Sequence, residues 1–317
     1  MQLKQLGTTD LRIPPIVFGG NVFGWTLDEA ASHRMLDDLV SRGFTAFDTA
    51  DVYSRWATGN SGGESESIIG SWLAARSKRD SITLITKVGH DMGQGHLDLS
   101  AGYIAQACED SLRRLQTDCI DLYFSHSDDE RTEPEETLRA YEKLIESGKV
   151  RHIGASNFSV ARLEKSLSIS QQQSLPAYSV LQPEYNLYSR QQFEQEFASV
   201  VQQHQLGVIT YYTLASGFLS GKYKSAGDLD QSQRGGGVEK YVSSPRGQAL
   251  LRALEKVSQR HAVEPAAVAI AWVLLNPLVS APIVSATQTK HVDAFEQALG
   301  LELSQADLQS LDVAESP

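Results

Sequence analysis

Residues 44–53 read Phe-Thr-Ala-Phe-Asp-Thr-Ala-Asp-Val-Tyr, and the rest of the chain is interpreted around this stretch. Its first half alternates large apolar residues with smaller ones, which predicts a short buried strand that breaks into a loop. The loop carries Asp48, Asp51 and Tyr53. Because the ordinary pKa of tyrosine is about 10, a catalytic tyrosine needs a nearby cation to stabilise its phenolate. We expect that cation on a neighbouring strand.

Two further apolar runs, residues 82–86 and 120–125, are followed directly by Lys87 and His126. Three successive strand ends therefore carry, in this order, a carboxylate with a phenol, an amine and an imidazole. Taken singly, these side chains are also consistent with a buried ion pair, a packing aromatic and a hydrogen-bonded core histidine. Taken together at consecutive strand ends, they favour a catalytic site.

Apolar runs alternate with helical patterns along the whole chain, and each run ends in residues able to contact a ligand. The runs lie at residues 16–18, 44–47, 82–86, 120–125, 150–155, 178–181, 208–210 and 281–284. Barrel enzymes build their sites from the carboxyl ends of their strands, whereas a doubly wound sheet would show a GxGxxG turn after an early strand. The chain has no such turn. The pattern predicts an α/β fold, a (β/α)8 TIM barrel forming a single domain over residues 1–317, with residues 2–14 as an N-terminal hairpin that plugs the barrel floor.

The composition points to a small-molecule substrate. The 317 residues include 28 basic and 39 acidic side chains, and the formal net charge of −11 disfavours binding to nucleic acid or to anionic membrane surfaces. The longest apolar run, residues 266–275, is too short to span a bilayer, so we expect a cytoplasmic protein. Cys108 and Cys119 form no CxxC pair, so neither a metal site nor a disulfide framework is indicated. The oligomeric state is open, with a monomer as the default.

The motifs Asp-Thr-Ala-Asp-Val-Tyr, Thr-Lys-Val and Leu-Tyr-Phe-Ser-His resemble those of the aldo-keto reductase family, which also includes relatives that sit on potassium channels as beta subunits. The similarity runs from Leu6-Gly7 to the final helices. It implies an enzyme that reduces aldehydes or ketones with hydride from NADPH. In this scheme Tyr53 donates the proton, Lys87 lowers the pKa of Tyr53, Asp48 keeps Lys87 charged, and His126 polarises the substrate oxygen.

The same resemblance implies where the cofactor binds. Amide and hydroxyl groups at strand ends would hold the carboxamide, one tyrosine ring would stack on the nicotinamide, and the loop after residue 211 would wrap the pyrophosphate. We expect residues 224–245 to form a long lid without a packed face. The predicted cofactor residues are Gly20, Asn21, Ser156, Asn157, Gln182, Tyr211, Leu214, Ser216, Gly217, Leu219, Lys222, Ser285, Thr287, Gln288, Lys290 and His291.

The turn after the last strand bears on cofactor choice, because relatives hold the adenosine 2′-phosphate there. Gln288 stands where many relatives place an arginine, which leaves Thr287, Lys290 and His291 to meet the phosphate. A lysine lacks the bidentate fork of arginine, so we expect NADPH to be preferred over NADH by a reduced margin.

Two other functions are consistent with the sequence. A Schiff-base aldolase or lyase would use Lys87 as its nucleophile, but it leaves Asn157, Gln182 and Tyr211 without a role. A nucleotide-binding regulatory subunit would bind the cofactor but show very little cofactor turnover.

Overall fold

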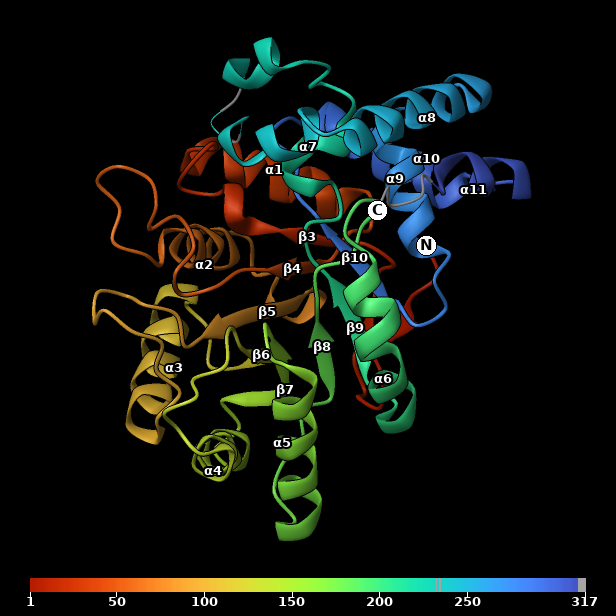
Figure 1. The fold of residues 1–317 in the computed structure, drawn as a ribbon. Helices are drawn as coiled ribbons and strands as arrows, with labels where there is room; N and C mark the ends of the chain where they lie inside the picture. Colours follow the sequence, from red (N-terminus) through yellow and green to blue (C-terminus); the bar gives the residue numbers. More distant parts are fainter. Residues whose placement is uncertain (232, 234, 313–317) are drawn as a thin grey trace.

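The computed structural model describes residues 1–231, 233 and 235–312. Within this part of the chain, eight parallel strands form a closed barrel (Figure 1), in which β10 pairs with both β9 and β3. The barrel strands are β3 (Val17–Gly19), β4 (Ala46–Asp48), β5 (Thr83–Val88), β6 (Ile120–Ser125), β7 (Val150–Ser156), β8 (Val180–Gln182), β9 (Gly207–Thr210) and β10 (Ala281–Val284). The predicted barrel is confirmed.

The strands are apolar because both of their faces are covered, as parallel barrels require. β6 is buried along its whole length. Six of the eight strands have boundaries that differ from the predicted runs by one or two residues; for example, β4 begins at Ala46, and β8 ends at Gln182. Gln182 is therefore the last residue of a strand, where the ladder holds its backbone.

Helices surround the strands (Figure 1) and pack their apolar faces on the barrel. They are α1 (Glu29–Ser41), α2 (Glu64–Arg76), α3 (Ala101–Leu115), α4 (Pro134–Glu146), α5 (Val160–Gln173), α6 (Ala198–His204), α7 (Glu239–Val242), α8 (Pro245–His261), α9 (Pro265–Leu274), α10 (Asp293–Gly300) and α11 (Gln305–Leu311). In the described part of the chain, none of them combines the length and the apolar character needed to cross a membrane.

The predicted N-terminal hairpin is present and closes the barrel at the amino ends of the strands. β1 (Lys4–Gln5) pairs antiparallel with β2 (Arg12–Ile13). Leu6 and Ile13 have no exposed surface and pack with the residues that fill the barrel interior. The hairpin approaches the start of β9 closely, since a Cβ added to Gly7 would lie 2.3 Å from the main-chain nitrogen of Gly207.

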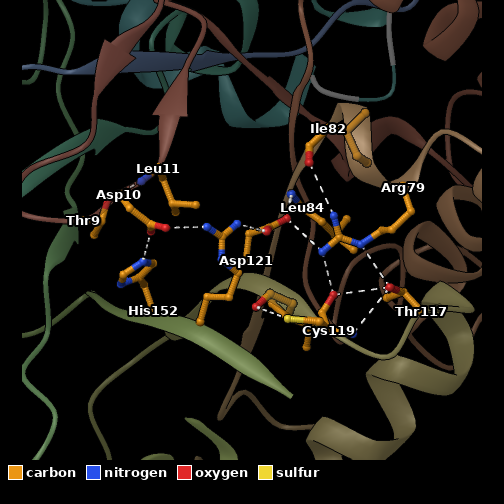
Figure 2. A network of polar contacts seen from close by, with 12 residues as sticks. Thr9, Asp10, Leu11, Arg79, Ile82, Leu84, Thr117, Cys119, Asp121 and His152 are labelled. Carbon is orange, nitrogen blue, oxygen red and sulfur yellow. Dashed lines mark hydrogen bonds and ion pairs between the residues drawn. The ribbon is translucent and has the colours of Figure 1, made fainter. Parts of the chain in front are cut away.

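A charged network ties this hairpin to the barrel (Figure 2). Asp121, near the start of β6, accepts hydrogen bonds from the main-chain nitrogen of Leu84 at 2.8 Å and from Arg151 at 2.7 Å, and forms an ion pair with Arg79 at 2.9 Å. Arg151 also reaches Asp10 of the hairpin at 2.8 Å. Because this end of a barrel usually serves stability rather than catalysis, we interpret the network as structural.

The segment predicted as a lid without a packed face is in part anchored, so that prediction is wrong for its second half. Val238 has no exposed surface, and Tyr241 of α7 is buried and stacks on Phe218 with ring centroids 5.2 Å apart. Aromatic and apolar contacts thus hold this part of the segment on the barrel. Ser232 and Arg234 lie outside the described residues, as do residues 313–317.

Candidate active site

The predicted catalytic residues meet around the amine of Lys87, which has no exposed surface. Its Nζ donates hydrogen bonds to Asp48 Oδ2 at 2.6 Å, to the Tyr53 hydroxyl oxygen at 2.8 Å and to the main-chain oxygen of Thr49 at 2.8 Å. The Tyr53 hydroxyl lies 3.3 Å from Asp48 Oδ2. The structure brings these side chains together because β4 and β5 are neighbours in register, and their carboxyl ends open on the same face.

Electrostatics in this cluster differ in one respect from the sequence-based expectation. Burial raises the pKa of Tyr53 well above its ordinary value, and the Asp48 carboxylate raises it further. The expectation that the pKa of Tyr53 is lowered in the protein is therefore wrong, because its phenolate would be buried beside a carboxylate. Burial lowers the pKa of Lys87, although Asp48 opposes this change. Tyr53 is thus a neutral phenol that keeps its proton at neutral pH.

His126 follows β6 and faces Tyr53, with the two rings 5.9 Å apart and nearly perpendicular at 71°. Burial lowers the pKa of His126 well below its ordinary value, and the positive charge of Lys87 adds to this effect. The imidazole is therefore neutral and carries one N–H. Its Nδ1 atom is buried without a hydrogen-bond partner among the described residues.

Four of the predicted cofactor residues form a chain of hydrogen bonds across the ends of β7, β8 and β9. Gln182 Nε2 donates to Asp48 Oδ1 at 3.0 Å, which links the chain to the catalytic cluster, and Ser156 Oγ donates to the main-chain oxygen of Gln182 at 2.8 Å. Tyr211 donates its hydroxyl proton to Asn157 Oδ1 at 2.8 Å. Asn157 has a φ of 54°, a left-handed conformation that is uncommon for residues other than glycine and occurs often at functional sites.

Gly20 and Asn21 lie just beyond β3, and Asn21 Oδ1 accepts a hydrogen bond from Ser285 Oγ at 2.7 Å. A Cβ on Gly20 would lie 3.0 Å from Ser65 Oγ and 3.2 Å from the main-chain oxygen of Asp48. A side chain at this position would therefore crowd neighbouring protein atoms, which would have to shift slightly to admit it.

The predicted pyrophosphate loop contains a short 3-10 segment, Ala215–Ser220. Ser216 and Gly217 have φ values of 59° and 96°, and glycine adopts this region without strain. Leu219 has no exposed surface, and Leu214 packs against the same apolar cluster. Their side chains therefore help to anchor the loop, and Leu219 can meet a ligand only through its main-chain groups.

A basic cluster lies at the far end of the predicted cofactor path. Lys222 belongs to the loop after β9, whereas Lys290 and His291 lie in the 3-10 segment Thr289–Val292 after β10. The pKa of His291 is lowered, first by burial and then by the charges of Lys290 and Lys222, so the three side chains influence one another. Thr287 and Gln288 are exposed beside them. Such a cluster fits a phosphate group.

A row of rings borders the catalytic cluster. Trp56 is 50% exposed and contacts the rings of Tyr53 and Trp25 at centroid distances of 5.9 and 5.7 Å. On the other side of Tyr53, the ring of His126 packs on that of His90 at 4.3 Å. The sequence analysis did not single out His90. The run Lys87-Val-Gly-His90 at a strand end was the signal that could have found it.

Asp51 lies in the stretch of residues 44–53, but the sequence alone does not reveal its environment. Asp51 is 2% exposed, and both carboxyl oxygens lack a hydrogen-bond partner in the described part of the chain. Burial raises the pKa of Asp51 well above its ordinary value, and the neighbouring Glu66 carboxylate raises it further. Glu66 itself is paired with Arg114 at 2.7 Å. Asp51 is therefore a buried acid whose carboxyl oxygens have no partner in the described part of the chain, and its main-chain nitrogen donates a hydrogen bond to the main-chain oxygen of Lys87 at 3.2 Å.

Comparisons with known proteins agree with this fold and site. The sequence model of the Aldo/keto reductase family matches residues 15–315. An uncharacterized oxidoreductase of Bacillus subtilis (strain 168) is 33% identical over 320 residues, which cover 98% of this chain and 95% of the relative. A probable voltage-gated potassium channel subunit beta of Oryza sativa subsp. japonica is 32% identical over 308 residues, which cover 94% of this chain and 91% of the relative. The L-glyceraldehyde 3-phosphate reductase of Escherichia coli (strain K12) is 28% identical over 323 residues, which cover 98% and 92%.

In the described part of the chain, a lysine, a tyrosine and a carboxylate are joined by hydrogen bonds at the carboxyl ends of the strands of a closed barrel. The chain belongs to the aldo/keto reductase family. It is accordingly an oxidoreductase of carbonyl compounds.

Proposed function

We propose that the protein reduces aldehyde or ketone carbonyls to alcohols with NADPH as the hydride donor and Tyr53 as the general acid. The observation that carries this proposal is the position of Lys87 Nζ, 2.8 Å from the Tyr53 hydroxyl oxygen and 2.6 Å from Asp48. NADPH, when bound, supplies the hydride that reduces the carbonyl carbon. The protein must then protonate the carbonyl oxygen and stabilise the charge that develops on it.

The charge state of each side chain determines which part of the reaction it can perform. His126 donates the N–H of its neutral ring to the carbonyl oxygen, which polarises the bond. Tyr53 holds its proton until that oxygen becomes alkoxide-like and more basic than a phenolate, and then transfers it. Lys87 stabilises the phenolate that remains, and Asp48 compensates the buried ammonium charge.

The cofactor site follows from the arrangement of the strand ends. Asn157 and Gln182 would hold the carboxamide, and the ring of Tyr211 would cover the nicotinamide. The hydrogen bond from Gln182 to Asp48 couples this cofactor face to the catalytic cluster. The basic cluster of Lys222, Lys290 and His291 supports a phosphate-bearing dinucleotide, so NADPH is the proposed cofactor and NADH a weaker alternative. We also infer that residues 1–317 form one domain, because the described strands close a single barrel.

The test is NADPH oxidation, followed at 340 nm across a panel of aldehydes, ketones and quinones, with Tyr53→Phe as the decisive variant. The variant lacks the general acid, so turnover should fall at least about 100-fold while NADPH affinity stays unchanged. Tyr188→Phe is the matched control, because it removes a hydroxyl that bonds Ser244, outside the catalytic cluster. Wild-type turnover in Tyr53→Phe would contradict the proposal.

The relationship to the probable channel subunit of rice supports a second candidate, a nucleotide-binding regulatory subunit. Under that hypothesis bound NADPH would be oxidised at most once per molecule over the course of an assay, and a stable complex with another protein should be isolable. Multiple-turnover kinetics separate the two candidates. The aldolase hypothesis has less support, because Lys87 has no exposed surface through which a carbonyl carbon could reach its Nζ.

A further inference from the structure

The ring of His126 is held by packing. Its Nδ1 atom has no hydrogen-bond partner among the described residues, so hydrogen bonding at this atom does not fix the ring. The ring of His90 packs on it at a centroid distance of 4.3 Å and an interplanar angle of 73°, closer than the ring of Tyr53 at 5.9 Å. Edge-to-face aromatic contacts of this kind contribute about 0.5–1.5 kcal/mol beyond the area they bury. The contact with His90 is therefore the closer of these two ring contacts, and it restrains the orientation of the His126 ring.

His90 is itself held in place from several sides. Its Nε2 lies 3.1 Å from Ser127 Oγ, and its main-chain oxygen accepts a hydrogen bond from Gln94 Nε2 at 3.0 Å and another from the Tyr103 hydroxyl at 3.5 Å. The chain reaches this position through Gly89, whose φ of 109° is favourable only for glycine. A side chain fixed in this way can act as a rigid support.

Both rings are neutral at neutral pH. Burial lowers the pKa of His90, the charge of Lys87 lowers it further, and Asp91 opposes these effects. The pKa of His126 is lowered by burial, by Lys87 and by His90. Two neutral imidazoles can pack edge to face without the repulsion that two imidazolium ions would experience.

We propose that His90 is a positioning residue for carbonyl reduction, which acts by holding the ring of His126 so that its Nε2–H faces the substrate oxygen. The inference rests on the proposed function. In this scheme Ser127 fixes His90, His90 fixes His126, and only His126 contacts the substrate. The shape of the His90 ring positions His126, and ionisation of His90 is not needed for this role.

Two substitutions at position 90 separate shape from ionisation. His90→Ala removes the supporting ring, so kcat should fall roughly tenfold or more, since small misplacements of catalytic groups have effects of this size. His90→Phe keeps an aromatic ring in contact with His126 and should retain at least about half of the wild-type kcat. NADPH affinity should be unchanged in both variants. Ser127→Ala removes only the hydrogen bond that holds His90, and should give a smaller loss of kcat in the same direction.

A double-mutant cycle with His126→Ala tests whether His90 acts through His126. If it does, His90→Ala should change kcat less than twofold when His126 is already absent. An undiminished loss in the His126→Ala background would overturn the inference, as would wild-type kcat in His90→Ala. A loss in His90→Phe as large as that in His90→Ala would also overturn it. In each of these outcomes the wild-type protein still reduces carbonyls, whereas failure of the proposed function would remove activity from the wild-type protein itself.

Discussion

Lys87 Nζ and Asp48 Oδ2 form an ion pair at 2.6 Å in which the two side chains are only 0% and 1% exposed. Water therefore has little access to either group, so each charge is stabilised mainly by the opposite charge of its partner. Asp48 also accepts a hydrogen bond from Gln182 at its Oδ1 atom, so its two oxygens bind different partners, Lys87 on β5 and Gln182 on β8. This pair connects the stability of the barrel mouth to its chemistry.

Lys87→Met should reduce both turnover and stability. Removing one partner leaves the other as an uncompensated buried charge, so the free energy of unfolding should fall by about 3–5 kcal/mol. Adding Asp48→Asn to this variant should restore most of the lost stability, because it removes the orphan charge, but it should not restore turnover. Urea denaturation and NADPH oxidation measure the two effects. Equal stability of the single and double variants would contradict this account.

The pH profile of reduction should end on its basic side with the loss of the Lys87 proton. The pKa of Lys87 is lowered from its ordinary value, whereas that of Tyr53 is raised well above its own, so Lys87 titrates first as the pH rises. Turnover should be constant through neutral pH and then fall about tenfold per pH unit. Lys87→Met should be slow but show no such basic limb. A basic limb that persists in Lys87→Met would assign it to another group.

Asp51→Asn should stabilise the protein by an amount that grows with pH. The pKa of Asp51 is raised in the folded state, so folding retains a proton that the unfolded chain loses above about pH 4. The folded wild-type protein therefore loses stability as the pH rises toward the folded pKa, and the neutral amide does not. Urea denaturation between pH 4 and pH 9 should show this trend, whereas the exposed Asp80→Asn control should not. A difference that is the same at every pH would show that Asp51 is not protonated.

Cofactor preference should depend on the exposed position 288. We expect wild-type protein to bind NADPH about 10- to 100-fold more tightly than NADH, equivalent to about 1.4–2.8 kcal/mol, and the margin should shrink with added salt. Gln288→Arg should widen it, because a guanidinium binds phosphate bidentately. Gln203→Arg on α6 adds the same charge elsewhere and should leave it unchanged. Fluorescence titration of both reduced cofactors decides the matter, and equal or tighter NADH binding would refute the preference.

Asp121→Asn should lower stability without affecting catalysis. Asp121 is 5% exposed and binds two arginines in the network that ties the hairpin to the barrel (Figure 2), and it lies near the start of β6, at the amino ends of the barrel strands. We expect the free energy of unfolding to fall by about 2–3 kcal/mol, less than for a fully buried pair, because Arg79 and Arg151 are 25% and 42% exposed. Asp10→Asn, which changes a 68% exposed partner in the same network, should change it by less than about 1 kcal/mol. A loss of kcat per folded molecule in Asp121→Asn would contradict the structural role.

The order of strand ends along the sequence was sufficient to predict which side chains meet. In a barrel of parallel strands all carboxyl ends open on one face, so Asp48, Tyr53, Lys87 and His126 had to lie near one another once each was recognised at the end of a strand. The N-terminal hairpin could also be predicted from the sequence, because its turn residues and its length are local features. Periodicity and turn chemistry are properties of short segments, and a sequence displays them directly.

Only the tertiary structure decided the electrostatics and the contacts between elements. The pKa of Tyr53 is raised because several strands and loops together bury it, and no single segment encodes that burial. The contact of His90 with His126 joins two strand ends, and the anchoring of Tyr241 on Phe218 joins segments that are neighbours only in space. Asp51 lies in the stretch that predicted the fold, yet its raised pKa depends on its burial and on the charge of Glu66, which lies on α2. The burial of a side chain and its distances to other side chains depend on elements that are far apart in the sequence. They are therefore set only when these elements pack together in the closed barrel.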